Sequence, residues 1–582
     1  MQKEVYEYIS KQTNDPIIER RKCKISGEDF AIFQSDIDFL DKLSPVIGSK
    51  KYNIPLPKLD PYQRNKRRLA YRNDSKIYRR NCDLTGKSFI SMYSPDKKLK
   101  VYHHDFWFSD QWDALDYGCD FDFNKSFFDQ FHILSLQVPR LGMQLKNCEN
   151  CDYCCVVVNG KNCYLSNVCS WSEEMYYSTW TTHSKKSIDC FRCYQIEDSY
   201  ECVLCNNSQK LKYCLMTNNS FNCLFCTNLD GCESCFMSYN LVNKKYCIRN
   251  KQYTKEEYQN FIKHIDFCDI NQFDKLYIEY QNNIQNKVIY KMNYNTNSED
   301  VFGSFLTKSK NCIVSFDLVT GENCKYYFDA GSNEKDCLDC SYGGDIQRSY
   351  ECLSSGTTGF HNLFCTFCRN CSNMIYCDIC MDSNNCFGCI GLCNKQYCIF
   401  NKQYTKKEYE KLVPQIIEHM KKTLERGEFF PISHSPFAYN ETVAMEYYPI
   451  SAQDAKNNSY SWQEKEYPVN IPSNFDKILS KDIPYNINEI KDSILNKVLV
   501  CELSGKPYRI ISSELEFYRT HNLPIPHLHQ DVRQQKRIVQ RPGRNLYLRK
   551  CDHCNLESIS VYPKNTKFKV FCENCYNQEF YG

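Results

Sequence analysis

The chain has 582 residues, of which 39 are cysteine, and a formal net charge of +3. This length exceeds what one hydrophobic core normally serves, so we expect several domains. No run of about eighteen apolar residues occurs, which excludes a membrane-spanning helix. The first residues lack the apolar stretch of a secretory signal, so we expect a cytoplasmic, reducing setting.

A polar lead-in precedes an N-terminal module that contains two short cysteine turns. These turns run from Cys23 to Gly27 and from Cys82 to Gly86, and the sequence Asn-Ile-Pro-Leu-Pro, which begins at Asn53, lies between them. The C-terminal end of the chain repeats this order of cysteine turn, Asn-hydrophobic-Pro-hydrophobic-Pro, basic segment and cysteine turn. We interpret the two ends as an internal duplication.

An arginine-rich segment follows the proline-containing sequence in both copies. A basic strip beside a zinc ribbon suits the phosphate backbone of a nucleic acid. The alternative is a solvated basic helix face that has no ligand. The candidate nucleic-acid-binding residues are Arg64, Arg67, Arg68, Arg72, Arg533, Arg537, Arg541 and Arg544.

Cysteines between Cys148 and Cys247 fall at multiples of three residues, except for Cys155, and many pairs lie twelve residues apart. A chain that coils every twelve residues, with one residue in three turned inward, would stack identical positions about 4.8 Å apart in a parallel β-solenoid. The spacing does not decide between coils of twelve and twenty-four residues. The interior thiols could be inert packing, disulfides or metal ligands.

The first cysteine repeat ends at a capping box, Thr254 to Glu257, which predicts the start of a helix. The twelve-residue spacing then returns between Cys312 and Cys398, with slips of one residue that imply bulges. A second capping box begins at Thr405. We expect the helix after each repeat to cover the last coil.

The C-terminal module carries a complete metal signature. Its cysteines follow the pattern C-x2-C, seventeen residues, C-x2-C, which is the spacing of a zinc ribbon or treble clef. Four thiolates fill all positions of a tetrahedron, so the pattern predicts one structural zinc site and no catalysis. Two disulfides are the alternative. The predicted ligands are Cys551, Cys554, Cys572 and Cys575.

The matching positions of the N-terminal copy have lost most of these ligands. Cys82, Thr85, His103 and Phe106 stand where the four cysteines stand in the other copy. We expect this turn to have lost its metal and to keep its shape by aromatic packing. The alternative is that Cys82 and His103 recruit a ligand such as His104 or the cysteine of the first turn.

These patterns predict a mainly β chain: two short-coil, cysteine-rich parallel β-solenoids of twelve-residue repeat, flanked by duplicated zinc-ribbon or treble-clef-like terminal modules with helical linkers. The expected segments are a lead-in at 1–22, a degenerate zinc-ribbon-like module at 23–146, solenoids at 147–253 and 312–404, a helical linker at 254–311, a helix and irregular linker at 405–498, and a zinc-ribbon module at 499–582.

The order of these motifs, including the exit sequence Tyr-Cys-Ile-x-Asn-Lys-Gln-Tyr-Thr, resembles a group of uncharacterised zinc-ribbon and cysteine-repeat proteins of small-genome candidate-phylum bacteria and their phages. The resemblance covers most of the chain and implies an architecture without an activity. Members of that group carry more complete C-x2-C pairs in their terminal modules. The chain departs from them at Ser26, Thr85 and Ser504.

The sequence has no acid, base and nucleophile constellation, no phosphate loop and no dinucleotide fingerprint. We therefore expect a non-enzymatic scaffold or binding protein. Its terminal modules would contact nucleic acid or a nucleoprotein complex, and its solenoids would bind protein or act as spacers. The alternative is a redox or metal-storage protein that uses the cysteine ladders.

Overall fold

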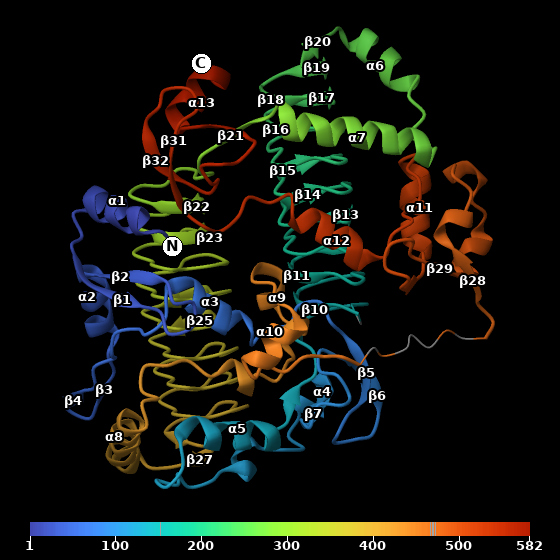
Figure 1. The fold of residues 1–582 in the computed structure, drawn as a ribbon. Helices are drawn as coiled ribbons and strands as arrows, with labels where there is room; N and C mark the ends of the chain where they lie inside the picture. Colours follow the sequence, from blue (N-terminus) through green and yellow to red (C-terminus); the bar gives the residue numbers. More distant parts are fainter. Residues whose placement is uncertain (152, 466, 468–470, 472) are drawn as a thin grey trace.

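The computed structural model describes residues 1–582 except 152, 466, 468–470 and 472. Two elongated stacks of coils lie side by side and run in opposite directions, and the helices and small sheets of the two chain ends pack on them (Figure 1). We call residues 145–248 coil stack 1 and residues 296–399 coil stack 2. In the described part of the chain, no helix combines the length and apolarity needed to cross a membrane.

The N-terminal module consists of short helices and two-stranded sheets. Its elements are α1 (Lys3–Thr13), β1 (Ile17–Lys22), β2 (Asp29–Phe33), α2 (Gln34–Leu43), β3 (Val46–Ile47), β4 (Lys50–Lys51), α3 (Pro61–Leu69), β5 (Tyr78–Asn81), β6 (Ser88–Ser91), β7 (Val101–Tyr102), α4 (His104–Trp107), α5 (Phe127–Gln137) and β8 (Arg140–Leu141). Each of the two cysteine turns joins the strands of an antiparallel hairpin, β1–β2 or β5–β6.

Coil stack 1 is built from short strands and is followed by two helices. Its elements are β9 (Leu145–Lys146), β10 (Cys155–Val158), β11 (Asn167–Ser170), β12 (Glu173–Tyr176), β13 (Lys185–Ile188), β14 (Tyr194–Glu197), β15 (Asn206–Gln209), β16 (Thr227–Asp230), β17 (Glu233–Phe236), β18 (Tyr239–Val242) and β19 (Lys245–Ile248), followed by β20 (Lys251–Gln252), α6 (Lys255–Lys263) and α7 (Ile270–Asn286). The capping box predicted at Thr254 is confirmed as the start of α6.

Coil stack 2 is also built from short strands, and the C-terminal part combines short helices with small sheets, as the N-terminal module does. The strand β21 (Ile289–Lys291) precedes the stack. The elements of coil stack 2 are β22 (Phe302–Thr307), β23 (Ile313–Val319), β24 (Gly344–Gln347), β25 (Gly356–Phe360) and β26 (Cys398–Ile399), followed by β27 (Lys402–Gln403) and the helix α8 (Lys406–Lys422). The elements of the C-terminal part are α9 (Val443–Tyr447), α10 (Ala452–Asn457), β28 (Asp476–Leu479), β29 (Lys497–Val500), β30 (Pro507–Tyr508), α11 (Ser512–Thr520), α12 (Gln530–Ile538), β31 (Tyr547–Lys550), β32 (Glu557–Ser560), β33 (Lys569–Phe571) and α13 (Glu573–Phe580).

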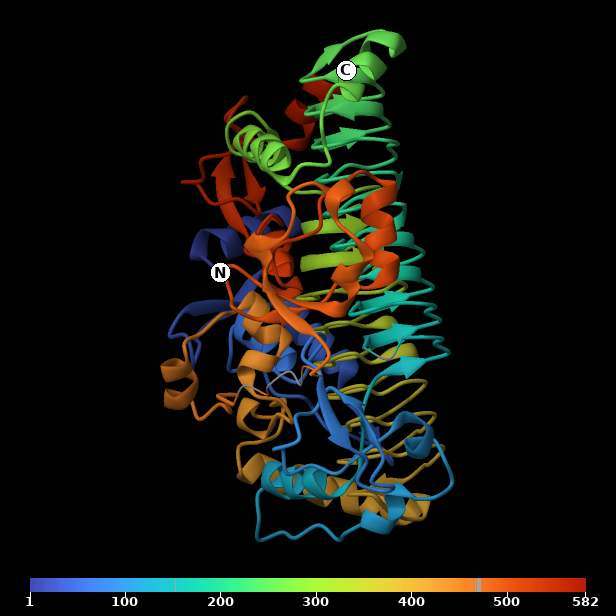
Figure 2. The same cartoon turned by 90° about the vertical axis from the view of Figure 1, so that its right-hand side faces the viewer.

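Residues twelve apart in the sequence pair in parallel within both stacks. Cys235 pairs with Cys247 in coil stack 1, and Phe387 pairs with Ile399 in coil stack 2. The spacing becomes thirteen at some coils of the second stack, as at Tyr350, which pairs with residue 363. The twelve-residue register read from the cysteines is therefore confirmed, and so are bulges in the second repeat. Figure 2 shows the coils of the first stack edge on.

A left-handed residue stands at nearly every third position of both stacks, and it explains the cysteine spacing. Asn147 and Asp189 have φ values of 52° and 54°, and the next residue, Cys148 or Cys190, turns inward. A left-handed residue with a side chain costs roughly 1–2 kcal/mol. Hydrogen bonds between successive asparagine side chains offset part of this cost. Asn150 donates to the side chain of residue 162 at 2.9 Å.

The predicted fold class is wrong. The described residues contain thirteen α-helices beside the strands, and the strands form separate sheets of two to four members, some parallel and some antiparallel. The strands and helices therefore do not form a mainly β chain of two long parallel β-solenoids. The physical reason is the left-handed corner at every third residue, which interrupts the extended backbone and shortens most strands of the stacks to about four residues.

Candidate metal centre

The metal centre is built on a turn between β31 and β32. The backbone N–H of Cys551 donates to the carbonyl of Leu556 at 2.9 Å, and the N–H of Asn555 donates to the carbonyl of Cys551 at 3.0 Å. Asn555 takes the left-handed conformation with φ of 62°. This turn, which we call a cysteine knuckle, presents Cys551 and Cys554 on one side.

The second cysteine pair comes from the start of a helix. Cys572 is the N-cap of α13, and Cys575 lies in its first turn. The four Sγ atoms lie within 4.8 Å of one another, and those of Cys554 and Cys572 are 3.8 Å apart. Four sulfurs bound tetrahedrally at about 2.3 Å are separated by roughly 3.8 Å. The predicted Cys551, Cys554, Cys572 and Cys575 set could therefore hold a metal ion.

Backbone N–H groups stabilise the thiolate form of Cys551. Burial raises the pKa of the Cys551 thiol, but N–H donors from residues 554, 572 and 553 outweigh burial and bring the pKa to about 7. The N–H of Cys572 lies 3.2 Å from the Cys551 sulfur, and the N–H of His553 lies 3.4 Å from it. A bound cation would neutralise the thiolates and link the knuckle to α13.

The same knuckle occurs three more times, at Cys23, Cys82 and Cys501. In each, the cysteine N–H donates across the turn, at 2.8 to 3.0 Å, to the carbonyl of the residue five positions later. The N–H of the residue four positions on returns to the cysteine carbonyl. That residue is a left-handed glycine in all three cases: Gly27, Gly86 and Gly505.

Each of these three knuckles faces the N-cap of a helix, as Cys551 faces Cys572. The N-caps are Asp60 of α3, His103 of α4 and His529 of α12. Ser26 donates to the Asp60 carboxylate at 2.7 Å, and the N–H of His103 lies 3.4 Å from the Cys82 sulfur. At the first knuckle, the side-chain hydrogen bond between Ser26 and Asp60 thus joins two positions that a metal would bridge. The contact between His103 and Cys82 matches the one between Cys572 and Cys551 in the four-cysteine knuckle.

Within the described residues, no second group of three or more Cys, His, Asp or Glu ligands gathers within 4.8 Å. Cys82 and His103 therefore stand without the extra ligand that would complete a site there. Asp60 and His529 are partners of their knuckles that the motif patterns did not predict. Their equal place in the duplication, 469 residues apart, was a signal that could have identified them.

The N-terminal candidate arginines lie inside the molecule. Arg64 pairs with Asp339 of coil stack 2 at 2.9 Å, and Arg68 pairs with Glu351 of the same stack at 2.8 Å. Arg67 also contacts Glu351, at 3.0 Å, and Glu428 at 2.8 Å. All three guanidinium groups are buried.

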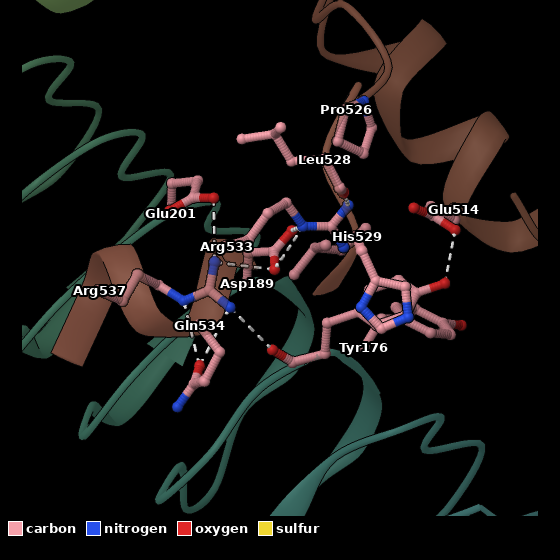
Figure 3. Close-up of polar contacts among 12 residues, drawn as sticks. Tyr176, Asp189, Glu201, Glu514, Pro526, Leu528, His529, Arg533, Gln534 and Arg537 are labelled. Carbon is pink, nitrogen blue, oxygen red and sulfur yellow. Dashed lines mark hydrogen bonds and ion pairs between the residues drawn. The ribbon is translucent and has the colours of Figure 1, made fainter. Parts of the chain in front are cut away.

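The C-terminal candidates make the matching contacts on coil stack 1 (Figure 3). Arg533 pairs with Asp189 at 3.1 Å, and Arg537 pairs with Asp189 at 2.8 Å and with Glu201 at 3.0 Å. Arg533 stacks over the ring of Tyr177 at 4.8 Å. Helix α12 is thus fastened to two successive coils of the stack.

The contacts of α3 with coil stack 2 and of α12 with coil stack 1 are equivalent, and each joins a stack to the helix from the opposite end of the chain, an arrangement that we call crosswise docking. Arg64 lies 5.0 Å from the ring of Tyr326, as Arg533 lies over its own tyrosine. The helix from the N-terminal end rests on the second stack, whereas the helix from the C-terminal end rests on the first. The duplication has therefore kept both the arginines and the left-handed Tyr, Asp and Glu corners that receive them, Asp339 and Asp189 among them.

The remaining candidates lie between the stacks. Arg72 pairs with Asp74 at 2.8 Å, whereas Arg541 and Arg544 both reach Asp317 of coil stack 2. A guanidinium from the first stack, Arg192, joins the same cluster. The structure therefore places all eight candidate arginines in ion pairs within the chain, and all of them are buried except Arg541, which is partly buried. Nucleic-acid binding by them stays a prediction.

No protein-family model matches the chain, and no curated protein matches it. A search of solved structures finds the crystal structure of a protein assigned as an acetyltransferase from Desulfovibrio desulfuricans G20. The match has 11% sequence identity and a TM-score of 0.09, and it covers 42% of this chain and 58% of that one. A similarity at this level carries no conclusion about fold or activity.

Proposed function

We propose that the chain is a non-enzymatic scaffold whose C-terminal module is braced by one structural zinc ion. The observation that carries this proposal is the crosswise docking of α3 and α12. Each stack is tied to the module from the opposite end of the chain by buried arginine–carboxylate pairs. Removal of one partner from such a pair leaves a buried charge uncompensated, so the contacts oppose any other arrangement.

The outer faces of the stacks support a role in protein binding. Glutamate and lysine alternate along part of one exposed column of each stack, over residues 149–197 and 299–335, and some neighbours in the column form ion pairs. Lys245 meets Glu233 at 2.6 Å, and Lys310 meets Glu299 at 2.9 Å. Alternation avoids the repulsion that like charges would feel when stacked one strand apart. Long regular surfaces of this kind suit a protein partner.

The choice of zinc rests on the donor set. Four thiolates in a closed tetrahedron are typical of structural zinc, and they leave no open position for a substrate. The metal-storage alternative has less support, because the described residues gather a single group of three or more metal ligands. The buried cysteine clusters of the stacks are the observation that would favour the redox alternative. The proposal of a non-enzymatic role is supported by this closed metal site and by the sequence, which has no acid, base and nucleophile constellation.

The docking half of the proposal can be tested by small-angle X-ray scattering on the full-length, zinc-loaded protein. The dimensions should not change between roughly 0.1 and 1 M salt, because buried ion pairs are screened much less than exposed ones. The Arg68→Met, Arg537→Met double variant should expand or lose its fixed shape. A wild-type protein that expands with salt, or a double variant of unchanged shape, would contradict the scaffold.

Nucleic acid is the other class of partner that the scaffold could bind. Phosphates could reach Arg64, Arg68 and Arg72 only by displacing their carboxylate and aromatic partners. We therefore expect no binding of generic DNA or RNA that depends on these residues. A salt dependence that flattens by up to roughly three units of slope in the triple alanine variant would instead support nucleic-acid binding.

A further inference from the structure

A groove of about 1330 Å³ opens where the first coils of coil stack 2 meet both terminal modules. We call it the end groove. Residues 292–302 line one side, α2 lines another, and Cys572 and Glu573 of the metal module line a third. Pockets for small molecules typically enclose about 300–1,000 Å³. The end groove therefore has room for a segment of a polymer.

Acidic side chains outnumber basic ones in the lining of the end groove. It contains two lysines, and both are engaged: Lys42 pairs with Asp336 at 2.8 Å, and Lys325 pairs with Asp36 at 2.7 Å. Six acids line the groove: Asp15, Asp38, Glu299, Asp300, Asp336 and Glu573.

Several of these acids have no cationic partner. Asp38, Asp300 and Glu573 are exposed and take part in no ion pair among the residues that the structure describes. An anionic polymer such as nucleic acid would be repelled from this lining, whereas a cationic chain would be attracted to it.

The first coil also offers an unpaired backbone edge. Inside the stack, left-handed residues donate to the preceding coil: the N–H of Lys308 reaches the Thr296 carbonyl at 2.9 Å, and that of Asn311 reaches residue 299 at 3.1 Å. Asn297 and Asp300 occupy the same left-handed positions one coil earlier. Their N–H groups have no backbone partner within the described chain.

Carbonyl groups at this edge are free in the same way. Outward residues of each coil donate to carbonyls of the next, as Glu299 donates to the Ser309 carbonyl at 2.9 Å. No preceding coil supplies such donors to Ser298 and Val301 in the described structure. A strand edge with unpaired donors and acceptors is a template for another chain.

We propose that the end groove binds a peptide rich in lysine or arginine, which follows the first coil of coil stack 2 around its corner and pairs with its backbone. The carbonyls of the peptide would accept from Asn297 and Asp300, and its cations would face Asp38, Asp300 and Glu573. Backbone pairing supplies affinity in this mode, and side-chain contacts supply selectivity. The inference adds a site to the scaffold and requires neither the zinc ion nor the arginine contacts to move.

The test uses the full-length, zinc-loaded protein and a fluorescent peptide of alternating lysine and valine. Fluorescence anisotropy should show binding that weakens with salt. The Asp38→Lys, Asp300→Lys double variant should weaken it about tenfold, the loss expected when two exposed charge contacts are reversed. Glu516→Lys is the matched control, since this exposed acid lies on α11, outside the lining of the end groove, and it should leave the affinity unchanged.

Two further probes separate the parts of the inference. A glutamate–valine peptide should not bind, and equal binding of both peptides would overturn the charge argument. A lysine–valine peptide with N-methylated backbone keeps its charge and its carbonyls but cannot donate to the Ser298 and Val301 carbonyls, so it should lose much of its affinity. Retained affinity of the methylated peptide would overturn the edge pairing. The scattering test of the scaffold is independent of both results.

Discussion

The cysteine knuckle at Cys551 and the one at Cys82 share a backbone but not a chemistry. Both close with the same pair of backbone hydrogen bonds and a left-handed residue at the fifth position. One faces a cysteine N-cap and completes a four-sulfur group, whereas the other faces His103 and does not. The comparison teaches that the turn is specified by backbone geometry, and that metal capacity depends on a few side chains added to it.

The sharpest way to break this comparison is to remove a sulfur. Cys554→Ser should abolish metal binding by the C-terminal module and make residues 547–582 susceptible to protease, because metal binding and local folding are coupled in such small units. Metal content by mass spectrometry and limited proteolysis measure both effects. Cys501→Ser, in an incomplete knuckle, is the control and should leave the metal content unchanged. An unchanged metal content in Cys554→Ser would refute the site.

The next test compares the two docking helices. Arg537→Met leaves the buried Asp189 and the partly buried Glu201 short of a partner, and loss of one partner of a buried pair typically costs about 3–5 kcal/mol. Arg68→Met should cost a similar amount, because its contacts with Glu351 are equivalent. Chemical denaturation of the full-length protein gives both values. A small loss in either variant would show that the two docking contacts are not equivalent.

The knuckle at Cys501 should respond to pH. Burial lowers the pKa of its N-cap, His529, from 6.5 to about 4, and nearby Lys506 and Arg533 add to the shift against the opposing effect of Asp531. The unfolded chain therefore binds a proton that the folded chain does not between about pH 6.5 and 4. Stability from this group is complete above pH 6.5 and is lost as the pH falls toward 4, by up to roughly 3 kcal/mol.

The control for this effect is His529→Asn, which keeps a good N-cap without a titrating group. Denaturation of the variant and the wild type at several pH values should show that the wild type loses more stability between pH 6.5 and 4. Parallel curves for the two proteins would contradict the assignment to His529.

The smallest expected effect is at the first knuckle. Ser26→Ala removes the 2.7 Å hydrogen bond to Asp60 and should cost about 1.5 kcal/mol, the low end for a bond to a charged group. Thr85→Ala, at the matching place in the second knuckle, should cost less, because its hydroxyl contacts the exposed N–H of Lys87 and the Cys82 sulfur and has no carboxylate partner. Thermal unfolding measures both. An equal loss would mean that Ser26 does not replace a metal bridge.

The sequence was informative wherever geometry repeats locally. The spacing of Cys190 and Cys202 gave the parallel register, and that of Cys551 and Cys554 gave half of the metal group. The fold class failed because residues such as Val156 and Trp180 occupy left-handed corners that their propensities disfavour. No rule of local sequence propensity predicts a left-handed corner at such a residue.

The arginines show a different limit. Their clustering in the sequence looked like an electrostatic footprint, yet the carboxylates that neutralise them lie far away along the chain. Arg67 and Glu351 are separated by 284 residues. Charge patterning reports the sign of a segment, but it cannot report whether a distant segment of opposite sign folds back onto it. The same reasoning applies to Arg537 and Glu201.

The crosswise docking has a consequence for how the chain is made. Arg67 is synthesised 284 residues before Glu351. At roughly 5–20 residues per second, this interval lasts roughly 15–60 s. During that time α3 has no surface to rest on. Helix α12 instead leaves the ribosome after coil stack 1 is complete and finds its carboxylates in place. The two duplicated ends thus differ in when they can dock during synthesis. Helix α3 is made before its binding surface, whereas α12 is made after its own and can dock at once.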